Sequence, residues 1–291
     1  MQSIQKPAWL KATIPGFGMY PEVRKVLRKH FLHTVCEEAL CPNLGECWGG
    51  GTATIMILGD ICTRSCRFCA VKSGNAMGLV DENEPYNVAK AVGELGLKYV
   101  VLTSVCRDDL PDGGAKAYAE TVKAIKNINK NVLVEVLIPD FNGDRSAIQT
   151  VVNSGPDVVA HNVETVRRLS QHVRDRRASF DQSLRVLKLV KEIDRDVFTK
   201  SSIMVGLGET VDEVVEAMRE LRSVDVDFIT IGQYLRPTLR HLPVKEYVHP
   251  SVFEHYREQA LKLGFKYAAC GPLVRSSYRA GEYFVRALLA R

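Results

Sequence analysis

From residue 53 onward, short apolar runs alternate with longer amphipathic segments, and this alternation constrains the fold of the 291-residue chain more than any other feature. The apolar runs are nearly continuous in Val, Ile and Leu, as in parallel strands that are covered on both faces. Strands are expected at Ala53–Leu58, Tyr99–Thr103, Val132–Ile138, Val158–His161, Thr199–Val205 and Phe228–Gly232. Helices are expected at Val88–Leu95, Ala115–Asn129, Arg145–Asn153, Val166–His172, Gln182–Ile193 and Val211–Ser223. Asp181 and Glu209–Thr210 are typical of helix starts.

Six successive strand–helix units predict a parallel α/β fold. A closed eight-unit barrel usually needs about 250 residues, so we expect an incomplete (β/α)6 barrel over residues 53–240. An N-terminal extension, residues 1–52, should hold one helix near Glu22–His33. A C-terminal extension, residues 241–291, should hold a helix at Pro250–Leu263, a strand at Lys266–Ala269 and a helix at Gly281–Leu289. Active sites in such barrels lie at the carboxyl ends of the strands.

The composition is that of an ordinary globular protein, with 46% hydrophobic and 25% charged residues. The net charge of +5 is too small to indicate nucleic-acid binding, although it could favour an acidic protein partner. No run approaches the ~20 apolar residues of a membrane span, and the first residues lack the pattern of a signal peptide. We therefore expect a cytoplasmic protein with no membrane or nucleic-acid partner.

Six of the eight cysteines lie between positions 36 and 69, and in a reducing compartment such clustering favours metal binding or redox chemistry. The first cysteine set is Cys62, Cys66 and Cys69, spaced C-x3-C-x2-C directly after the first expected strand. Three thiolates can hold three corners of an iron–sulfur cubane, which leaves the fourth iron open for catalysis. Structural zinc, the alternative, usually shows two paired groups of ligands.

The second cysteine set is Cys36, Cys41 and Cys47, spaced C-x4-C-x5-C in a loop that contains proline and glycine. It also offers three thiolates rather than four. Taken alone, this pattern fits either an iron–sulfur cluster or a structural zinc site. The remaining two, Cys106 and Cys270, are expected to be small core residues, as free cysteines often are.

The two spacings together resemble lipoyl synthase, a family of the radical S-adenosylmethionine superfamily, and the resemblance extends along nearly the whole chain. It includes KPAWLK near the start, CPN and ECW in the second set, and Phe68 before the last cysteine of the first set. It continues in TSV, RDDL, DGG, HNVET, MVGLGE and GQYLRP, and ends on RSSYRA. Residues 174–180 depart from the proline- and glycine-containing segment typical of the family.

The resemblance implies two [4Fe–4S] clusters and S-adenosylmethionine as cofactors. The first cysteine set would hold the cluster that cleaves S-adenosylmethionine. The second set would hold an auxiliary cluster with a serine as its fourth ligand, here Ser277 or, less well matched, Ser276. Alternatively, both serines could serve only as helix caps. Contacts to S-adenosylmethionine are expected from Thr103, Ser104, Asn162, Glu164, Arg174 and Gly206. Arg236 and Arg275 are further candidates for carboxylate contacts, whereas Asp108, Asp109 and the Asn162–Glu164 pair could equally be structural.

The implied reaction is insertion of two sulfur atoms at C6 and C8 of a protein-bound octanoyl-lysine. It would use two S-adenosylmethionine molecules, with the auxiliary cluster sacrificed as the sulfur source. Partners would be octanoylated carrier domains, namely the E2 subunit of a 2-oxoacid dehydrogenase or the glycine cleavage H protein, and an electron donor such as ferredoxin or flavodoxin. The basic face of the first helix could dock an acidic carrier, although such faces are usually only solvated. The alternatives are a methylthiotransferase, a biotin-synthase-like enzyme and a ferredoxin, each of which calls for cysteine spacings or domains that this chain lacks.

Overall fold

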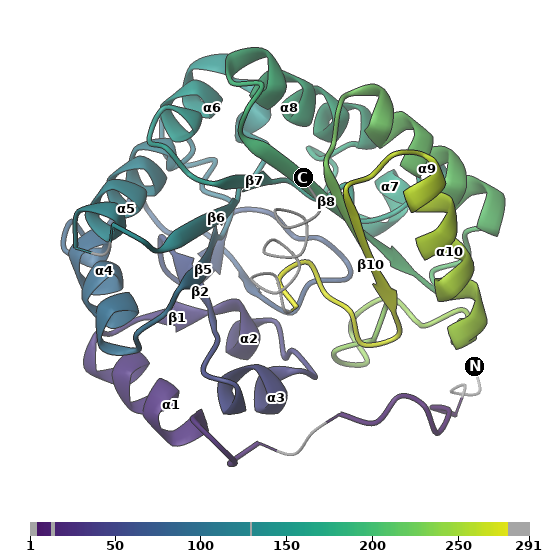
Figure 1. The fold of residues 1–291 in the computed structure, drawn as a ribbon, viewed down its shortest axis with the longest axis horizontal. Coiled ribbons are helices and arrows are strands. Elements are labelled where there is room, and N and C mark those ends of the chain that lie inside the picture. Colours follow the sequence, from purple (N-terminus) through teal and green to yellow (C-terminus); the bar gives the residue numbers. More distant parts are fainter. Residues whose placement is uncertain (1–4, 13–14, 129, 279–291) are drawn as a thin grey trace.

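The computed structural model describes residues 5–12, 15–128 and 130–278. An open eight-stranded sheet forms its centre, with the strand order β1-β2-β5-β6-β7-β8-β9-β10 (Figure 1). The edge strand β1 pairs antiparallel with β2, and every other neighbouring pair in this sheet is parallel. The strands are β1 His33–Thr34, β2 Thr54–Ile57, β5 Tyr99–Ser104, β6 Leu133–Leu137, β7 Val158–Ala160, β8 Phe198–Val205, β9 Phe228–Gln233 and β10 Tyr267–Gly271.

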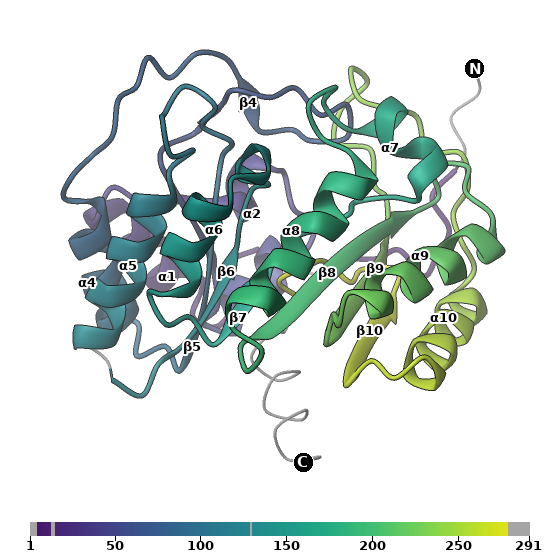
Figure 2. The same ribbon diagram turned by 90° about the horizontal axis from the view of Figure 1, so that it is seen from above.

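Helices cover the outer face of the curved sheet, each following the strand that precedes it in the chain (Figures 1 and 2). They are α4 Glu84–Glu94, α5 Ala115–Ile128, α6 Arg145–Val152, α7 Arg167–Val173, α8 Phe180–Ile193, α9 Val211–Ser223 and α10 Pro250–Lys262. Before the barrel come α1 Tyr20–Lys29, α2 Val35–Glu38 and α3 Leu44–Gly49. The six expected units and the incomplete parallel barrel are confirmed. The strand expected near Lys266 joins the sheet as the parallel edge strand β10.

One of the two expected helix starts differs from expectation. Asp181 does not cap its helix: α8 begins at Phe180, and the Ser179 side chain accepts a hydrogen bond from the Gln182 amide. A serine hydroxyl in extended backbone is the better cap because it reaches the amide donors of the first turn. The cap expected at Thr210 is confirmed, with a reciprocal capping box to Glu213. The helix expected at Gly281–Leu289 lies outside the described residues.

The amino-terminal end of the barrel is filled by side chains. Phe198 and Phe228, the first residues of β8 and β9, stack with their ring centroids 5.1 Å apart. Beside them the buried Lys200 ammonium lies 2.8 Å from the Glu135 carboxylate, which also accepts a 2.6 Å hydrogen bond from Tyr99. This packing leaves the carboxyl ends of the strands as the place for chemistry. None of the described helices is long and apolar enough to span a membrane.

Candidate active site

The first cysteine set lies on the loop that leaves β2. At Leu58 the chain adopts a φ of 68°. The buried Glu84 carboxylate accepts a 2.7 Å hydrogen bond from the Leu58 amide, and the Arg107 guanidinium donates to its carbonyl at 3.2 Å. These contacts satisfy both polar groups of the turning peptide, as buried backbone requires. The loop then forms the small parallel ladder of β3 (Ile61–Cys62) and β4 (Lys72–Ser73).

The three thiols of the first set influence one another electrostatically. Burial, followed by the charges of Cys66 and Cys62, raises the pKa of the Cys69 thiol to about 12. The neighbouring Cys106 thiol donates to the Cys62 sulfur and, against the effect of burial, lowers the pKa of Cys62 to about 6. Backbone amides also point at sulfur, from Arg64 to Cys62 at 3.4 Å and from Asp175 to Cys66 at 3.3 Å. Amide donors to cysteine sulfur are typical of iron–sulfur sites, so this donor set fits a cluster.

Within the described residues, no three or more His, Cys, Asp or Glu side chains lie close enough together to hold a single metal ion. A cubane, by contrast, bonds each thiolate to a different iron atom. The position of Cys106 corrects the expectation that it is an ordinary core residue. Its carbonyl accepts a 2.9 Å hydrogen bond from the Thr63 amide, inside the first cysteine set.

The polar residues expected to bind S-adenosylmethionine lie at strand ends. Thr103 and Ser104 close β5, where their hydroxyls donate to the carbonyls of Leu137 and Val105. Asn162 follows β7, and its Nδ2 donates to the Glu164 carboxylate at 3.1 Å. Among the residues that the structure describes, the buried Asn162 Oδ1 atom has no hydrogen-bond partner. A buried acceptor of this kind fits a ligand that brings an amine or hydroxyl donor, such as S-adenosylmethionine.

Glu164 combines backbone strain with a charged environment. Its φ is 67°, an uncommon conformation for a non-glycine residue and one often found at functional sites. Burial raises the pKa of its carboxyl group, opposed by the charge of Arg174, and the Glu164 charge in turn raises the thiol pKa of Cys66 and Cys69. The Glu164 carboxyl group therefore lies close enough to the first cysteine set for its charge to act on these thiols. Arg174 is buried, and its Nη1 donates to Ser183 Oγ at 2.8 Å, which ties Arg174 to α8.

Gly206 follows β8 with a φ of 93°. A Cβ atom at this position would lie 2.2 Å from Gln233 Nε2 and 2.4 Å from the Glu246 carbonyl oxygen. Only glycine fits this close backbone approach. Nearby, Phe68 of the cysteine loop packs against an apolar cluster that includes Leu207 and Tyr234. The backbone at Gly206 thus lies next to an apolar cluster, an arrangement that suits a planar base such as adenine.

The second cysteine set lies between the two edges of the open sheet. It follows the edge strand β1, whereas residues 272–278 follow the opposite edge strand β10 (Figure 1). Two hydrogen bonds join these segments: Asn43 Nδ2 donates to the Leu273 carbonyl at 2.6 Å, and the Tyr278 hydroxyl donates to Glu46 Oε1 at 2.7 Å. Both partners lie between Cys41 and Cys47. The segment that carries Ser276 and Ser277, both half-buried, is therefore held against the second cysteine set.

The remaining candidate arginines have different surroundings. Arg236 donates to the carbonyls of His241 and Leu239 and so braces its own loop. Arg275 donates to the Val274 carbonyl at 2.7 Å. Burial lowers the pKa of Arg275, and the charge of Cys41 opposes this shift, so the guanidinium and the Cys41 thiol of the second set influence each other electrostatically.

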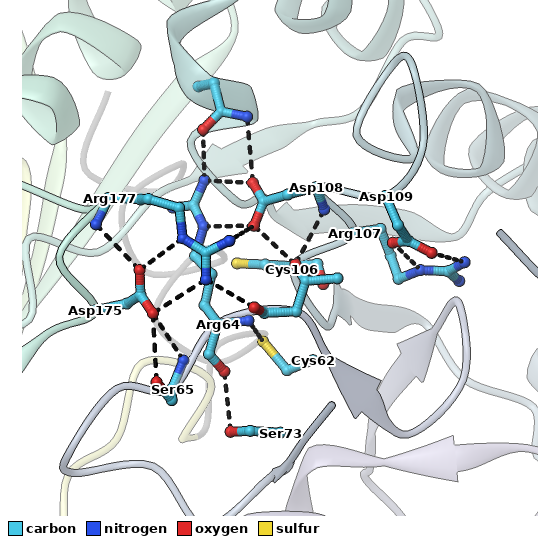
Figure 3. Close-up of polar contacts among 12 residues, drawn as sticks. Cys62, Arg64, Ser65, Ser73, Cys106, Arg107, Asp108, Asp109, Asp175 and Arg177 are labelled. Carbon is cyan, nitrogen blue, oxygen red and sulfur yellow. Dashed lines mark hydrogen bonds and ion pairs between the residues drawn. The ribbon is translucent and has the colours of Figure 1, made fainter. Parts of the chain in front are cut away.

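Sequence reasoning missed the polar network behind the first cysteine set. Arg64 lies between Cys62 and Cys66 and binds Asp108, while Arg177 binds Asp175 and Asp108 (Figure 3). Arg64 also binds Asp140, which follows β6. A cavity of about 140 Å³ borders this network and is lined by Arg64, Cys106, Asp108 and Asn142 among others. For Asp108 the sequence left a functional and a purely structural role equally open. The density of charged residues in 174–177 was the available signal, but nothing in the sequence indicates that this segment meets the cysteine loop.

Comparison with known families gives two matches. The Radical SAM superfamily matches residues 56–221, and the N-terminal domain of lipoyl synthase of the Radical SAM family matches residues 1–41. Among curated proteins, the mitochondrial lipoyl synthase of Bos taurus is 56% identical over the whole chain and 79% of its own length. Lipoyl synthase of Thermus thermophilus is 56% identical over 97% of the chain and 87% of its length. The apicoplast lipoyl synthase of Plasmodium knowlesi is longer, and the chain covers 64% of it at 56% identity.

Solved structures share the fold at low identity. Methylornithine synthase aligns with a TM-score of 0.54 and 15% identity, over 84% of this chain and 74% of its own. The [FeFe]-hydrogenase maturase HydG aligns with a TM-score of 0.56 and 13% identity, over 85% and 65%. These likenesses support the incomplete barrel alone. The sequence identity over nearly the full length goes further, and the chain belongs to the lipoyl synthase family of the radical S-adenosylmethionine superfamily.

Proposed function

We propose that this protein inserts two sulfur atoms, at C6 and C8, into an octanoyl group bound to a lysine of a carrier domain, and so forms the lipoyl cofactor. The observation that carries the proposal is the pairing of two three-cysteine loops with one open barrel. One loop lies at the strand ends with Glu164 and Asn162, and the other is clasped to the segment that carries Ser277. The chain is then a sulfurtransferase that uses S-adenosylmethionine and two [4Fe–4S] clusters.

The first cysteine set would hold the cluster that acts on S-adenosylmethionine. When bound, this cluster supplies the electron that cleaves the sulfonium and yields a radical able to take hydrogen from unactivated carbon. The chain itself supplies amide donors to the sulfurs of Cys62 and Cys66, which stabilise thiolate charge. Octanoyl C6 and C8 carry no acidic proton and no leaving group, so acid–base groups have nothing to act on there.

Strand-end residues would hold S-adenosylmethionine. Backbone groups at Thr103 and Ser104 suit its methionine end, because both hydroxyls are used within the chain. The unpartnered Asn162 Oδ1 and the Glu164 carboxylate suit the amine or ribose hydroxyls. Gly206 leaves room for the adenine. Arg174 would contribute charge through Glu164, since its Nη1 donates to groups of the chain.

The auxiliary cluster would be a substrate, consumed as the source of both sulfur atoms. Cys36, Cys41, Cys47 and Ser277 would bind it. A serine oxygen is a harder ligand than a thiolate and suits iron–sulfur chemistry less well, so this bond is the easier one to lose. The proposed three-part division, with residues 1–52 and 241–291 flanking the barrel at 53–240, follows from this role, because the two extensions supply the ligands together.

The carrier domain would dock through the basic face of α1, which would attract an acidic carrier surface. Arg28 and Lys29 form ion pairs with Glu37 and Glu94 inside the chain. The test therefore belongs at the exposed Arg24 and Lys25. Reversing both charges should weaken binding of an octanoylated E2 domain or H protein and reduce its salt dependence. Unchanged binding at all salt concentrations would remove α1 from the docking surface.

An electron donor such as ferredoxin or flavodoxin would reduce the first cluster. A groove of about 390 Å³ borders Cys66 and Cys69, and its rim includes the basic residues Arg67 and Arg240. An Arg240→Glu change should slow reduction by an acidic donor but not by dithionite. A cytoplasmic location fits these free thiols, because cytosolic thiol systems keep cysteines reduced.

The decisive experiment is isotopic. Both clusters are built with labelled sulfide, one turnover is run with unlabelled sulfide in solution, and the lipoyl product is weighed. Two labelled sulfurs in one lipoyl group, with two S-adenosylmethionine molecules cleaved, are expected. An unlabelled product would refute the auxiliary cluster as sulfur donor, and a product without sulfur would refute the function.

A further inference from the structure

We infer that Arg64 is the positioning residue of the first cysteine loop: with Asp175 and Arg177 it fixes the three-residue bridge between Cys62 and Cys66, and so tunes the cluster held there. The inference rests on the proposed function, because it assumes that this loop holds the cluster. Each residue of the bridge is held by carboxylates from other segments. Thr63 donates to Asp108, Arg64 binds Asp108 and Asp140, and the Ser65 amide donates to Asp175. Figure 3 shows Arg64 and Ser65 with Asp108 and Asp175.

Arg64 connects the loop to two successive strand ends. Its Nε and Nη2 contact the two oxygens of Asp108, after β5, at 3.0 and 2.8 Å. Its Nη1 and Nη2 contact those of Asp140, after β6, at 2.8 and 2.7 Å. Two bidentate pairs use the planar fork of arginine on both sides, which lysine cannot do. The Arg64 side chain is only 4% exposed, and that of Asp140 is 1% exposed, so water has little access to this ion pair.

The backbone of the same residue contacts the thiol. The Arg64 amide donates to Cys62 Sγ at 3.4 Å, and its carbonyl accepts from Ser73 Oγ at 3.0 Å. The pinned side chain therefore fixes the peptide whose N–H points at the sulfur. Such hydrogen bonds to sulfur are one of the means by which a protein sets the reduction potential of an iron–sulfur cluster.

The segment between α7 and α8 holds the other half of the bridge. Asp175 Oδ2 accepts from the Ser65 amide at 2.9 Å, and the Asp175 amide donates to Cys66 Sγ at 3.3 Å. Arg177 Nη2 donates to the Thr63 carbonyl at 2.7 Å, and its Nε donates to Asp175 at 2.8 Å. Arg177 also reaches Asp108 at 3.2 Å, which links both halves. The sulfurs of Cys62 and Cys66 thus receive their amide donors from one connected network.

Two variants and one matched control test this role on the full chain with both clusters loaded. Arg64→Lys keeps the charge but loses the double fork. Arg177→Gln removes the outer contact from a side chain that is 40% exposed, so it should fold even if Arg64→Lys does not. Arg145→Gln is the control for Arg177→Gln: the Arg145 side chain is also partly exposed, at 55%, and its Nη1 donates to Glu192 at 2.9 Å, a contact between α6 and α8 that involves none of Thr63, Arg64 and Ser65.

The readouts are the electron paramagnetic resonance signal that responds to S-adenosylmethionine, its midpoint potential, and the rate at which a chelator removes it. Both test variants should lower the midpoint potential, because weaker N–H donation to sulfur disfavours the reduced cluster, and should lose the signal about 10-fold faster. Arg145→Gln should leave all three readouts unchanged. Wild-type potential and loss rate in both folded variants would overturn the inference. A wild-type protein without any responsive signal would instead refute the proposed function.

Discussion

Replacing Tyr278 with phenylalanine should loosen the clasp between the C-terminal segment and the second cysteine set. The Tyr278 hydroxyl donates to Glu46 Oε1 at 2.7 Å, and a hydrogen bond to a charged group contributes about 1.5–3 kcal/mol. Both side chains are half-buried, so the lower end of this range applies. The loss of about 1.5 kcal/mol raises the detached fraction of the segment about 10-fold, and Ser277 is lost from the site whenever the segment detaches.

The assay separates the two clusters. In Tyr278→Phe a chelator should remove the auxiliary cluster about 10-fold faster, while the cluster that responds to S-adenosylmethionine is lost at the wild-type rate. Lipoyl product per S-adenosylmethionine cleaved should fall, while cleavage itself persists. Tyr86→Phe, at an exposed tyrosine on α4, is the control and should change neither rate. The reasoning fails if Tyr278→Phe holds its auxiliary cluster as long as the wild type, or if both clusters are lost together.

Three further outcomes follow from the site. Changing all three cysteines of the first set to alanine should remove one cluster and abolish S-adenosylmethionine cleavage. The same change in the second set should remove the other cluster and leave cleavage measurable. A triple variant that keeps all its iron contradicts the assignment. Burial, together with the charge of Arg174, lowers the pKa of His161 to about 4 from 6.5. As the pH falls, His161 is therefore protonated in the unfolded chain before it is protonated in the folded one. The free energy of unfolding of the cluster-free chain should fall by about 3 kcal/mol as the pH drops from about 6.5 to about 4. Denaturant titrations of His161→Gln should not show this loss. Gly206→Ala should weaken S-adenosylmethionine binding in equilibrium dialysis, while Gly264→Ala, with a similar φ of 92° but nothing nearer than 3.9 Å to the added Cβ, should bind normally.

The neutral state of His161 shows how the chain holds Arg174. The Ile138 carbonyl only accepts, so His161 Nδ1 donates to it at 2.8 Å, and Nε2 accepts from the Ser183 hydroxyl at 2.8 Å. That hydroxyl in turn accepts from Arg174. The sequence places His161 at the end of a strand. Its hydrogen bonds to Ile138 and Ser183, and through Ser183 to Arg174, form only because β6, β7 and α8 meet in the tertiary structure.

The sequence alone determined the architecture and the two cysteine sets. Nearly continuous apolar runs predict buried parallel strands, because a strand covered on both faces has no exposed side to make polar. The cysteine spacings predict two loops that each bind one iron–sulfur cluster, because the three cysteines of each set lie within a few positions of one another. Helix ends were less certain: Ser179 rather than Asp181 caps α8, since several polar residues near a start can cap it and local backbone decides which one does.

Only the tertiary structure decided which distant segments complete each loop. Asp175 lies more than a hundred positions from Ser65, and Tyr278 lies further still from Glu46, yet each pair is hydrogen-bonded. Cys106, which the sequence suggested was a core residue, instead lies beside Cys62. Periodicity reports which face of an element is buried, but it carries no information on which strand ends and loops converge. That convergence follows from the curvature of the open sheet, which brings β5, β6 and the segment after α7 around one short loop.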